Sequence, residues 1–459
     1  MKKSRSYSDP SLFSPRASLA ALAVNLRSLN LFDIIAQHVV IQQKTIKHSP
    51  IDKLTDAFIA ILSGARGLCE INTRVRTDKA VQRAFGRNDC AEQSVVQQTL
   101  DACTPENVSQ LEQAIDEILR THSRAFSHDY DRALQLIDID LTGMTCGQKA
   151  ERATKGYFRY RGKYGRQMGR VLAALYGEVV VDRLYAGNVQ LNTKLIELVE
   201  AMEKTLQLDE ARRKRTVLRI DAGGGSLDAI NWLLRRGYQI HLMDYSSRRA
   251  AKFSKYVREW TDNAIYSGRQ LGWVSVKSVG YARQVRQLLM GYRKKNGHTA
   301  YRMLLTTLEP NEVLTLLGRV AELDQPAATV ITSYAELYDL RGGTVEIEFK
   351  QDKQGIGIAK RNKKRFAAQQ VVMMLGTLAH NVLVWSKQRI VKQAPKLSGY
   401  GVQRIVRDVL TVSGKVELDK EGAIKKIVLS GASALAWQCI KSLKALLKPK
   451  HVVIILGEI

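Results

Sequence analysis

Three acidic residues stand where they could share one metal-dependent reaction. Asp140 lies toward the end of the strand-like stretch LQLIDIDLTG (134–143), Asp221 ends the strand-like stretch TVLRID (216–221), and Glu346 lies near the start of an expected helix (338–355). Carboxylate oxygens are the preferred ligands of hard cations such as Mg²⁺. Two such ions can flank a phosphodiester, one activating water or a 3′-hydroxyl and the other stabilising the leaving oxygen. The pattern therefore predicts phosphoryl transfer at a carboxylate-bound metal pair.

Two neighbouring acids compete for these roles. Asp138 and Asp140 point to the same face of the strand, because side chains alternate along it. Asp140 is preferred because it lies nearer the strand end. Asp228 falls in the first turn of an expected helix, where an acid complements the helix dipole. A single aspartate in a strand is usually structural, so the prediction depends on the combination.

Basic and aromatic side chains flank Glu346 at helical spacing. Tyr338 lies three residues before Arg341, and Lys350 and Lys353 follow Glu346 by four and seven residues. On a helix these positions share one face. Arg341 could bind a DNA phosphate in a bidentate manner, with Tyr338 and the two lysines as further DNA contacts. Glu346 and Lys350 could equally form a surface ion pair worth about 0.3 kcal/mol.

The elements that carry these residues predict an α/β fold. Three strand-like stretches (134–143, 168–177 and 178–187) precede a helix (189–207), a strand (216–221), a helix (226–237) and a strand (238–244). This is the order of the ribonuclease H-like fold, a mixed sheet flanked by helices. In that order the first and fourth strands are neighbours at the sheet centre. Asp140 and Asp221 are therefore expected to face each other at adjacent strand ends.

The chain is expected to have five parts. Residues 1–128 read as a helical N-terminal DNA-binding domain, in which 86–100 could be part of a helix-turn-helix or of an ordinary bundle. Residues 129–245 are expected to form the first part of the catalytic core. Residues 246–330 are expected to form an inserted subdomain with two basic helical stretches (246–264 and 279–297) and two strands (269–277 and 299–308). Residues 331–395 complete the core with the Glu346 helix, and 396–459 form a small basic C-terminal module.

Composition favours a polyanionic partner. The 459 residues carry 71 Lys and Arg against 44 Asp and Glu, a net charge of +27. Nucleic acid is the first candidate for such a chain, with an anionic membrane surface or a ribosomal neighbour as alternatives. The five cysteines form no Cys-x-x-Cys pair, which argues against structural zinc and fits a reducing cytoplasm. The sequence contains no uninterrupted run of about 18 apolar residues, so no membrane span is expected.

The whole pattern resembles the DDE transposases of bacterial insertion sequences with the Y-R-E-K signature. The residues that match are Tyr338, Arg341, Glu346 and Lys353, after Asp140 and Asp221 in two strands, and the D-x-T stretch at Asp140 is similar to the family's first motif. One spacing departs from the family. Four residues, GGTV, separate Arg341 from Glu346 where three are usual, and Gly342 and Gly343 could absorb the extra residue.

The resemblance implies a cut-and-paste enzyme. Such a protein binds terminal inverted repeats, hydrolyses a strand at each element end, and uses the freed 3′-hydroxyl to attack target DNA. It implies two Mg²⁺ ions, which Mn²⁺ could replace, held by Asp140, Asp221 and Glu346. It also implies a homodimer or higher assembly on double-stranded DNA in the bacterial cytoplasm, associated with the nucleoid. Trp273 is a candidate for stacking on a flipped base, with a core position as the alternative.

Two other functions stay open on the sequence. The turn DAGGGSLD (221–228), followed by Asp244 at the next strand end, is typical of S-adenosylmethionine-dependent methyltransferases. That interpretation leaves Asp140 and the Tyr338–Lys353 cluster without roles. A catalytically inactive DNA-binding relative of transposases is the second alternative. In a transposase, Gly223 and Gly224 would let the chain turn sharply and keep bulk away from the metals.

Overall fold

The structure is a computed structural model that describes residues 11–44, 47–156, 158, 162–319, 326–360 and 362–458. Its internal contacts divide the chain into two compact units. Unit 1 comprises Met1–His122, Lys149–Glu151 and Glu348–Ile459, and unit 2 comprises Ser123–Gln148 and Arg152–Ile347. These units cut across the five parts expected from the sequence, whose separate roles stay predictions.

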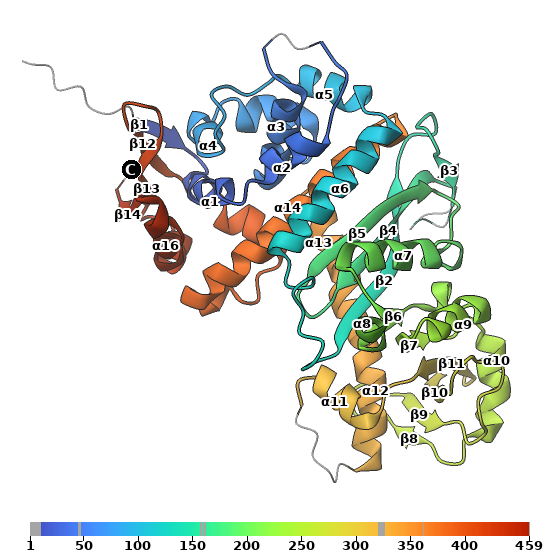
Figure 1. Ribbon diagram of the computed structural model, residues 1–459. Helices are drawn as coiled ribbons and strands as arrows, with labels where there is room; N and C mark the ends of the chain where they lie inside the picture. Colours follow the sequence, from blue (N-terminus) through green and yellow to red (C-terminus); the bar gives the residue numbers. More distant parts are fainter. Residues whose placement is uncertain are drawn as a thin grey trace, which may run out of the picture. The chain divides into compact units, whose positions relative to one another are not determined.

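Unit 2 contains, within its described residues, a ten-stranded sheet in the order β3-β4-β2-β6-β7-β11-β10-β9-β8, with β5 paired to β4 (Figure 1). The strands are β2 (Gln135–Thr145), β3 (Thr154–Lys155), β4 (Tyr164–Ala173), β5 (Glu178–Ala186), β6 (Thr216–Ile220), β7 (Gln239–Met243), β8 (Thr261–Asp262), β9 (Arg269–Trp273), β10 (Arg286–Arg293) and β11 (Thr299–Thr306). The helices are α7 (Leu195–Leu206), α8 (Glu210–Lys214), α9 (Leu227–Arg235), α10 (Ser247–Phe253), α11 (Pro310–Leu316) and α12 (Ala327–Arg341).

The central strands have the ribonuclease H-like order. β2, β4 and β5 form an antiparallel set, whereas β2 pairs with β6 and β6 with β7 in parallel. Parallel neighbours need a crossover connection, which the segments containing α7 and α9 provide. The predicted fold is confirmed, including the adjacency of the first and fourth strands.

The two faces of the sheet differ in chemistry. One face buries alternate residues such as Ile139, Leu218 and Ile220 in a core shared with α7 and α9. The opposite face packs residues such as Val217 and Leu304 against Tyr334 and other residues of α12. Because side chains alternate in a strand, the residues between Leu218 and Ile220, and between Ile137 and Ile139, point toward the α12 face. Asp138 and Arg219 are therefore on that face, and so are Asp140 and Asp221.

In residues 246–330, one of the two stretches expected to be helical forms a strand, whereas the strands expected at 269–277 and 299–308 are present as β9 and β11. After α10 the chain adds β8 to β11 to the same sheet, and β11 pairs antiparallel with β7. The stretch VGYARQVRQLLMGYRKKNG (279–297) was expected to be helical, but it contains β10. Its apolar centre, Leu288–Met290, is buried on successive positions. A strand that is buried on both faces has a continuous apolar run in its sequence. The spacing of apolar residues does not distinguish such a run from a short buried helix.

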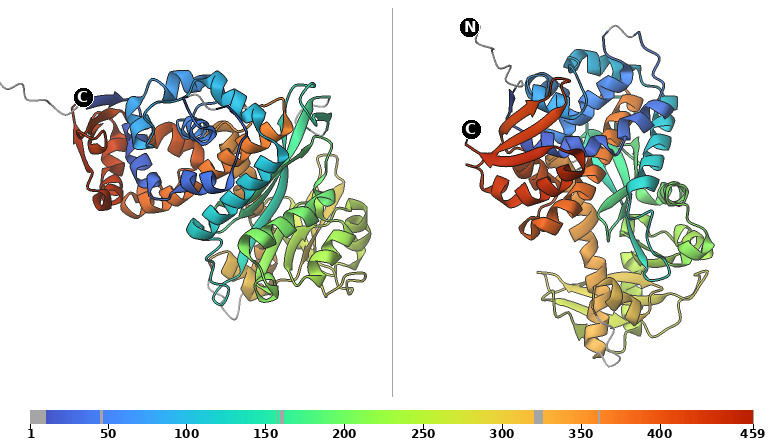
Figure 2. Two further views of the ribbon diagram at one scale, coloured as in Figure 1. Left: turned by 45° about the horizontal axis from the view of Figure 1, so that its top comes forward. Right: turned by 60° about the vertical axis from the view of Figure 1, so that its left-hand side comes forward.

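Unit 1 combines both ends of the chain. Its helices are α1 (Ala17–Arg27), α2 (Leu31–His38), α3 (Pro50–Leu62), α4 (Lys79–Ala84), α5 (Gln93–Ala102), α6 (Pro105–His122), α14 (Phe366–Gln393), α15 (Val402–Arg404) and α16 (Ala434–Leu447). Figure 2 shows these blue, orange and red helices side by side. A four-stranded sheet pairs β1 (Ser11–Ser14) with β12 (Gly414–Leu418), followed by β13 (Ile424–Ser430) and β14 (Val453–Gly457). The C-terminal segment is thus joined to the N-terminal one through strand pairing.

The long helix α14 is apolar enough, by length and composition, to cross a membrane. The bent pair α1 and α2 also passes that test if it counts as one span. In α14, 89% of the most apolar window is buried. It packs against α3, α5 and α6. Such a helix is hydrophobic all round because it lies in the centre of a core.

Candidate active site

Strand pairing brings Asp140 and Asp221 to neighbouring chain positions. In the parallel pair β2–β6, Asp138 lies opposite Arg219 and Ile139 lies opposite Ile220. Asp140 and Asp221 are the next residues along the two strands. Both side chains therefore leave the sheet on the α12 face. Asp221 directly follows β6, whereas β2 continues to Thr145, so Asp140 lies inside its strand and not at the predicted strand end.

A π-helical turn brings Glu346 to the same face. Helix α12 ends at Arg341, residues Gly342–Glu346 form the π-helical turn, and α13 (Ile347–Gln354) continues the chain. In such a turn the residue five positions ahead takes the place that the fourth has in an α-helix. Arg341 and Glu346 are five residues apart, and Arg341 Nη2 donates to Glu346 Oε1 at 3.1 Å. The extra residue in GGTV is accommodated by this turn.

Arg341 joins two of the three carboxylates. Its Nη1 donates to Asp140 Oδ2 at 3.0 Å while Nη2 holds Glu346. The Arg341 side chain is 8% exposed and that of Asp140 is 13% exposed, whereas that of Glu346 is 56% exposed. Although burial opposes the charge, Asp140, together with Tyr338 and Asp221, holds the pKa of Arg341 above its usual value. The guanidinium thus sits in the field of all three acids.

The pKa of Asp140 is raised, chiefly because its carboxyl group is buried. Burial raises the pKa of Asp140 to about 6 despite the opposing effect of Arg341, and the nearby charge of Asp221 raises it further. Burial likewise raises the pKa of Tyr338 to about 12. One guanidinium faces three carboxylates, and oxygen donors of this kind suit a hard cation.

Asp138 has a different task from Asp140. It is fully buried and accepts two hydrogen bonds from Arg219, from Nε at 2.6 Å and from Nη2 at 2.8 Å. Arg219 Nη1 also donates to the Leu337 carbonyl at 2.5 Å, and Nη2 donates to Thr344 Oγ1 at 3.1 Å. Thr344, inside the π-helical turn, donates in turn to Asp138. The ion pair therefore ties α12 and the turn that carries Glu346 to strands β2 and β6.

Sequence reasoning missed Arg219 and Thr344. The sequence contained an indication of Arg219, because the stretches D-I-D and R-I-D stand at the ends of the paired parts of β2 and β6. Residues two before the end of each stretch share the face of the terminal aspartates, so opposite charges at Asp138 and Arg219 in adjacent strands indicate a pair. Thr344 had no comparable signal, since its contact depends on the π-helical turn.

The glycine run after Asp221 serves close packing. Asp221 Oδ1 accepts a hydrogen bond from the Gly223 amide at 2.9 Å, which fixes the carboxylate at the strand end. A Cβ on Gly223 would lie 3.1 Å from the same Asp221 oxygen, and one on Gly225 would lie 2.4 Å from the Met243 carbonyl oxygen. None of the three glycines has a positive φ. Glycine is therefore required here because neighbouring atoms leave no room for a side chain. The closest backbone atom is the Met243 carbonyl oxygen, next to Gly225.

These contacts separate two glycine variants. Gly223→Val is expected to lower the rate of DNA cleavage at least tenfold with little change in melting temperature, because the new side chain displaces the Asp221 carboxylate. Gly225→Val is expected to lower the melting temperature by several degrees, since its side chain meets the backbone of β7, at a cost of about 1–3 kcal/mol. Thermal unfolding and a cleavage assay on both variants check this, and full activity of Gly223→Val would contradict the role given to that glycine.

The other residues singled out in the sequence lie as follows. Tyr338 is half-buried on α12, and Asp228 is exposed in the first turn of α9. Trp273 ends β9 with its ring edge-on to Tyr334, at 5.0 Å between centroids. Lys350 and Lys353 follow on α13 within unit 1, where Lys350 is exposed and Lys353 Nζ lies 6.0 Å from the Phe349 ring centre.

The methyltransferase interpretation finds no support in the surroundings of Asp244. Its carboxylate is buried in an ion pair with Arg249, 2.6 Å between Oδ2 and Nη2. After β7 the sheet continues with antiparallel β11 in place of a further strand–helix unit. A doubly wound nucleotide-binding sheet would need more parallel strands at this point.

Three comparisons with known proteins bear on the chain. The model of a family described as Transposase DDE domain group 1 matches residues 14–438. No curated protein sequence matches. Among solved structures, the chain is similar to one described as the cryo-EM structure of a piggyBac transposase synaptic complex with hairpin DNA. The TM-score is 0.45 and the identity 12%, over 84% of this chain and 79% of that one.

Proposed function

Because the chain belongs to the transposase DDE domain group 1 family, we propose that it is the transposase of a bacterial insertion sequence. It binds the terminal inverted repeats of its element, cleaves a strand at each end, and joins the freed 3′-hydroxyl to target DNA. Asp140, Asp221 and Glu346 form its catalytic site. This assignment includes an endonuclease step and a strand-transfer step at one centre.

The observation that carries the proposal is the convergence of the three acids. They come from two strands and a helical turn that lie as much as 206 residues apart in sequence. Arg341 hydrogen-bonds to Asp140 and Glu346 together, and the field of Asp221 acts on both Arg341 and Asp140. A buried guanidinium shared by carboxylates marks a place where positive charge is needed.

The donor set fits divalent metal ions. Asp140, Asp221 and Glu346 offer carboxylate oxygens, and burial together with the nearby charge of Asp221 raises the pKa of Asp140. These residues would hold two Mg²⁺ ions, which Mn²⁺ could replace. When bound, the ions activate the attacking water or 3′-hydroxyl and stabilise the leaving oxygen.

The protein's own residues supply position and charge. The Asp138–Arg219 pair and Thr344 hold the Glu346 turn against the strands that carry the two aspartates. Gly223 leaves room for the Asp221 carboxylate. Arg341 brings a planar set of donors that can turn from the carboxylates toward a phosphate. Tyr338, Lys350 and Lys353 are proposed as further DNA contacts.

Double-stranded DNA is the proposed partner. A net charge of +27 favours a long polyanion, and between Lys350 and Lys450 the chain has 21 basic and 5 acidic residues. Cleavage at two element ends is proposed to take place in a homodimer or higher assembly, in the bacterial cytoplasm.

Metal withdrawal tests the proposal. The full-length protein is incubated with a DNA fragment that carries an end of its element and flanking sequence. Strand cleavage at the element end is expected with Mg²⁺ or Mn²⁺, to stop with EDTA, and to return when Mg²⁺ is added in excess, because the carboxylates alone supply no cation for the leaving oxygen. Cleavage at the same position and rate in EDTA would contradict the proposed site.

A further inference from the structure

Unit 1 contains a basic cavity next to the first turn of α3. Its volume is about 340 Å³. The charged side chains that line it are four basic ones against two acidic ones, namely Lys44, Lys47, Lys53, Arg76, Asp89 and Glu92. These residues come from the part of the chain before α6 and contribute nothing to the carboxylate site of unit 2.

The deepest of these basic groups is Lys53. It is 3% exposed, and its ammonium donates one hydrogen bond, to Gln43 Oε1 at 3.2 Å. Among the described residues Lys53 forms no ion pair. Burial lowers the pKa of Lys53, and the nearby charge of Asp52 offsets this effect only in part. A lysine has three N–H donors, so a ligand with several oxygens can satisfy the donors that Gln43 leaves over.

The acids of the cavity do not neutralise it. Asp89 is held by Lys47 and by Lys79, with 2.9 Å between Lys79 Nζ and Asp89 Oδ1. Lys44 and Arg76 are exposed and form no ion pair within the described residues. A buried ammonium and two exposed cations thus line the same space.

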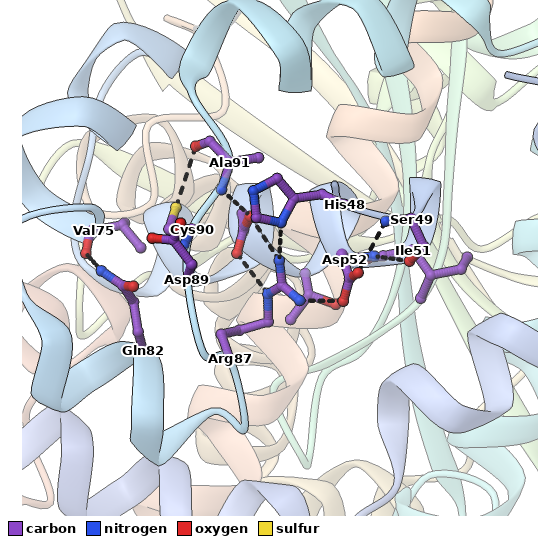
Figure 3. Close-up of polar contacts among 12 residues, drawn as sticks. His48, Ser49, Ile51, Asp52, Val75, Gln82, Arg87, Asp89, Cys90 and Ala91 are labelled. Carbon is purple, nitrogen blue, oxygen red and sulfur yellow. Dashed lines mark hydrogen bonds and ion pairs between the residues drawn. The ribbon is translucent and has the colours of Figure 1, made fainter. Parts of the chain in front are cut away.

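The walls of the cavity are held in place by a polar network (Figure 3). Arg87 Nε donates to Asp56 Oδ1 at 3.0 Å, and the guanidinium also contacts Asp52 and His48. Asp56 Oδ2 accepts the Ala91 amide at 2.8 Å, so the segment from Arg87 to Ala91 is fixed at both ends. A reciprocal capping bond between Ser49 and Asp52 fixes the turn that carries Lys53. The site is therefore formed before any ligand enters.

We propose that this cavity binds a phosphodiester group of the DNA backbone. The Lys53 ammonium provides the buried counter-charge, and Lys44 and Arg76 contact the same or the next phosphate from the exposed side. A phosphate offers the oxygens and negative charge that Lys53 lacks. The DNA backbone is favoured over a free anion because exposed cations continue the site to the surface, where successive phosphates are available. This inference rests on the proposed DNA-binding function and adds a second, non-catalytic contact to it.

The test uses the full-length protein and a fluorescent DNA duplex containing the element end, without divalent metal so that no cleavage occurs. Lys53→Met keeps the length of the side chain and removes its charge. Its affinity, measured by anisotropy, is expected to fall about 5–10-fold near 0.1 M salt, and the slope of log affinity against log salt to decrease by about 0.9. The melting temperature is expected to stay the same or rise, because a buried charge has been removed.

Two exposed arginines of unit 1 provide a matched pair that does not depend on a buried position. Arg76→Met is expected to reduce affinity and salt slope in the same direction as Lys53→Met. Arg66→Met removes an exposed arginine that does not line the cavity and is expected to change neither. Wild-type affinity and slope in both Lys53→Met and Arg76→Met would overturn the site and leave the proposed function standing.

A second arm separates the source of the phosphate. Melting temperatures are compared in inorganic phosphate and in chloride at equal ionic strength. If phosphate stabilises the wild type but not Lys53→Met, while both bind DNA equally, a free phosphate is the ligand and the DNA contact is overturned. Loss of DNA affinity in Lys53→Met without stabilisation of the wild type by phosphate supports the backbone contact. A wild type that binds no duplex would overturn the proposed function and this contact together.

Discussion

Alanine at Asp140, Asp221 or Glu346 is expected to reduce Mg²⁺-dependent strand cleavage by on the order of 10³-fold or more, with DNA affinity within about twofold of wild type. Each substitution removes one of the three carboxylates that are proposed to hold the metal ions. Because the three acids act on the same centre, a double alanine variant is expected to be no worse than a single one by more than about tenfold. Cleavage rates and duplex anisotropy on the same preparations provide the measurement.

Asp228→Ala is the matched control for these variants. Asp228 follows Asp221 by seven residues but is exposed on α9, where its contribution is that of an acid near a helix N-terminus. Cleavage is expected to be unchanged, and the free energy of unfolding to change by about 0.5 kcal/mol or less. Retained cleavage in Asp221→Ala, or equal losses in Asp221→Ala and Asp228→Ala, would contradict the assignment.

Arg219→Met is expected to be the most destabilising single substitution in unit 2 among those considered. It leaves the Asp138 carboxylate fully buried without its bidentate partner and removes the bond to the Leu337 carbonyl. Removing one partner of a buried ion pair costs about 3–5 kcal/mol. Urea unfolding followed by tryptophan fluorescence suits the measurement, because Trp232, Trp260 and Trp273 lie in unit 2. Cleavage is expected to fall as well, since the turn that carries Glu346 loses its anchor.

The double variant Asp138→Leu with Arg219→Met distinguishes the effect of the ion pair's charges from the effect of side-chain packing at these two positions. An apolar pair of similar volume avoids the buried unpaired charge, so stability is expected to recover to within about 1–2 kcal/mol of wild type. Cleavage is not expected to recover fully, because Thr344 has lost both partners on the strands. A single Arg219→Met variant that loses less than about 1 kcal/mol would show that Asp138 is not held as the contacts indicate.

The central fold could be predicted from the sequence because its signals are local. The strand–helix order from Gln135 to Met243 fixed which strands pair, and the parallel pairing of β2 with β6 then placed Asp140 beside Asp221. The alternation within IDID and LRID decided which face they share. These inferences depend on the direction of the chain and on the alternation of side chains along a strand, and both can be determined from the amino-acid sequence.

The parts that could not be predicted depend on tertiary contacts. Whether GGTV forms a π-helical turn depends on the contacts that Thr344 makes with Asp138 and Arg219, which are 206 and 125 residues away in the chain. The strand β10, expected to be helical, is buried on both sides of a sheet, and the pairing of β1 with β12 joins segments about 400 residues apart. Local propensity does not report such contacts.

Arg341 shows how one residue type permits two assignments. Its spacing from Tyr338 and Lys353 indicated a phosphate contact, and that role stays a prediction. In the structure the same guanidinium pairs with Asp140 and Glu346. The π-helical turn brings Glu346, five residues after Arg341, to the same face of the helix. Phosphate and carboxylate present similar oxygens to the planar donors of arginine, so sequence alone does not distinguish them.

The most direct test of the account is whether the three carboxylates are metal ligands of one site. Asp140→Cys, Asp221→Cys and Glu346→Cys each replace a hard oxygen ligand with a softer thiolate, which binds Mn²⁺ better than Mg²⁺. Cleavage by each variant is expected to be absent in Mg²⁺ and partly restored in Mn²⁺, with Asp138→Cys showing no such metal-specific recovery. Equal residual cleavage in the two metals for all three variants, or recovery only in Asp138→Cys, would contradict a shared metal site at Asp140, Asp221 and Glu346.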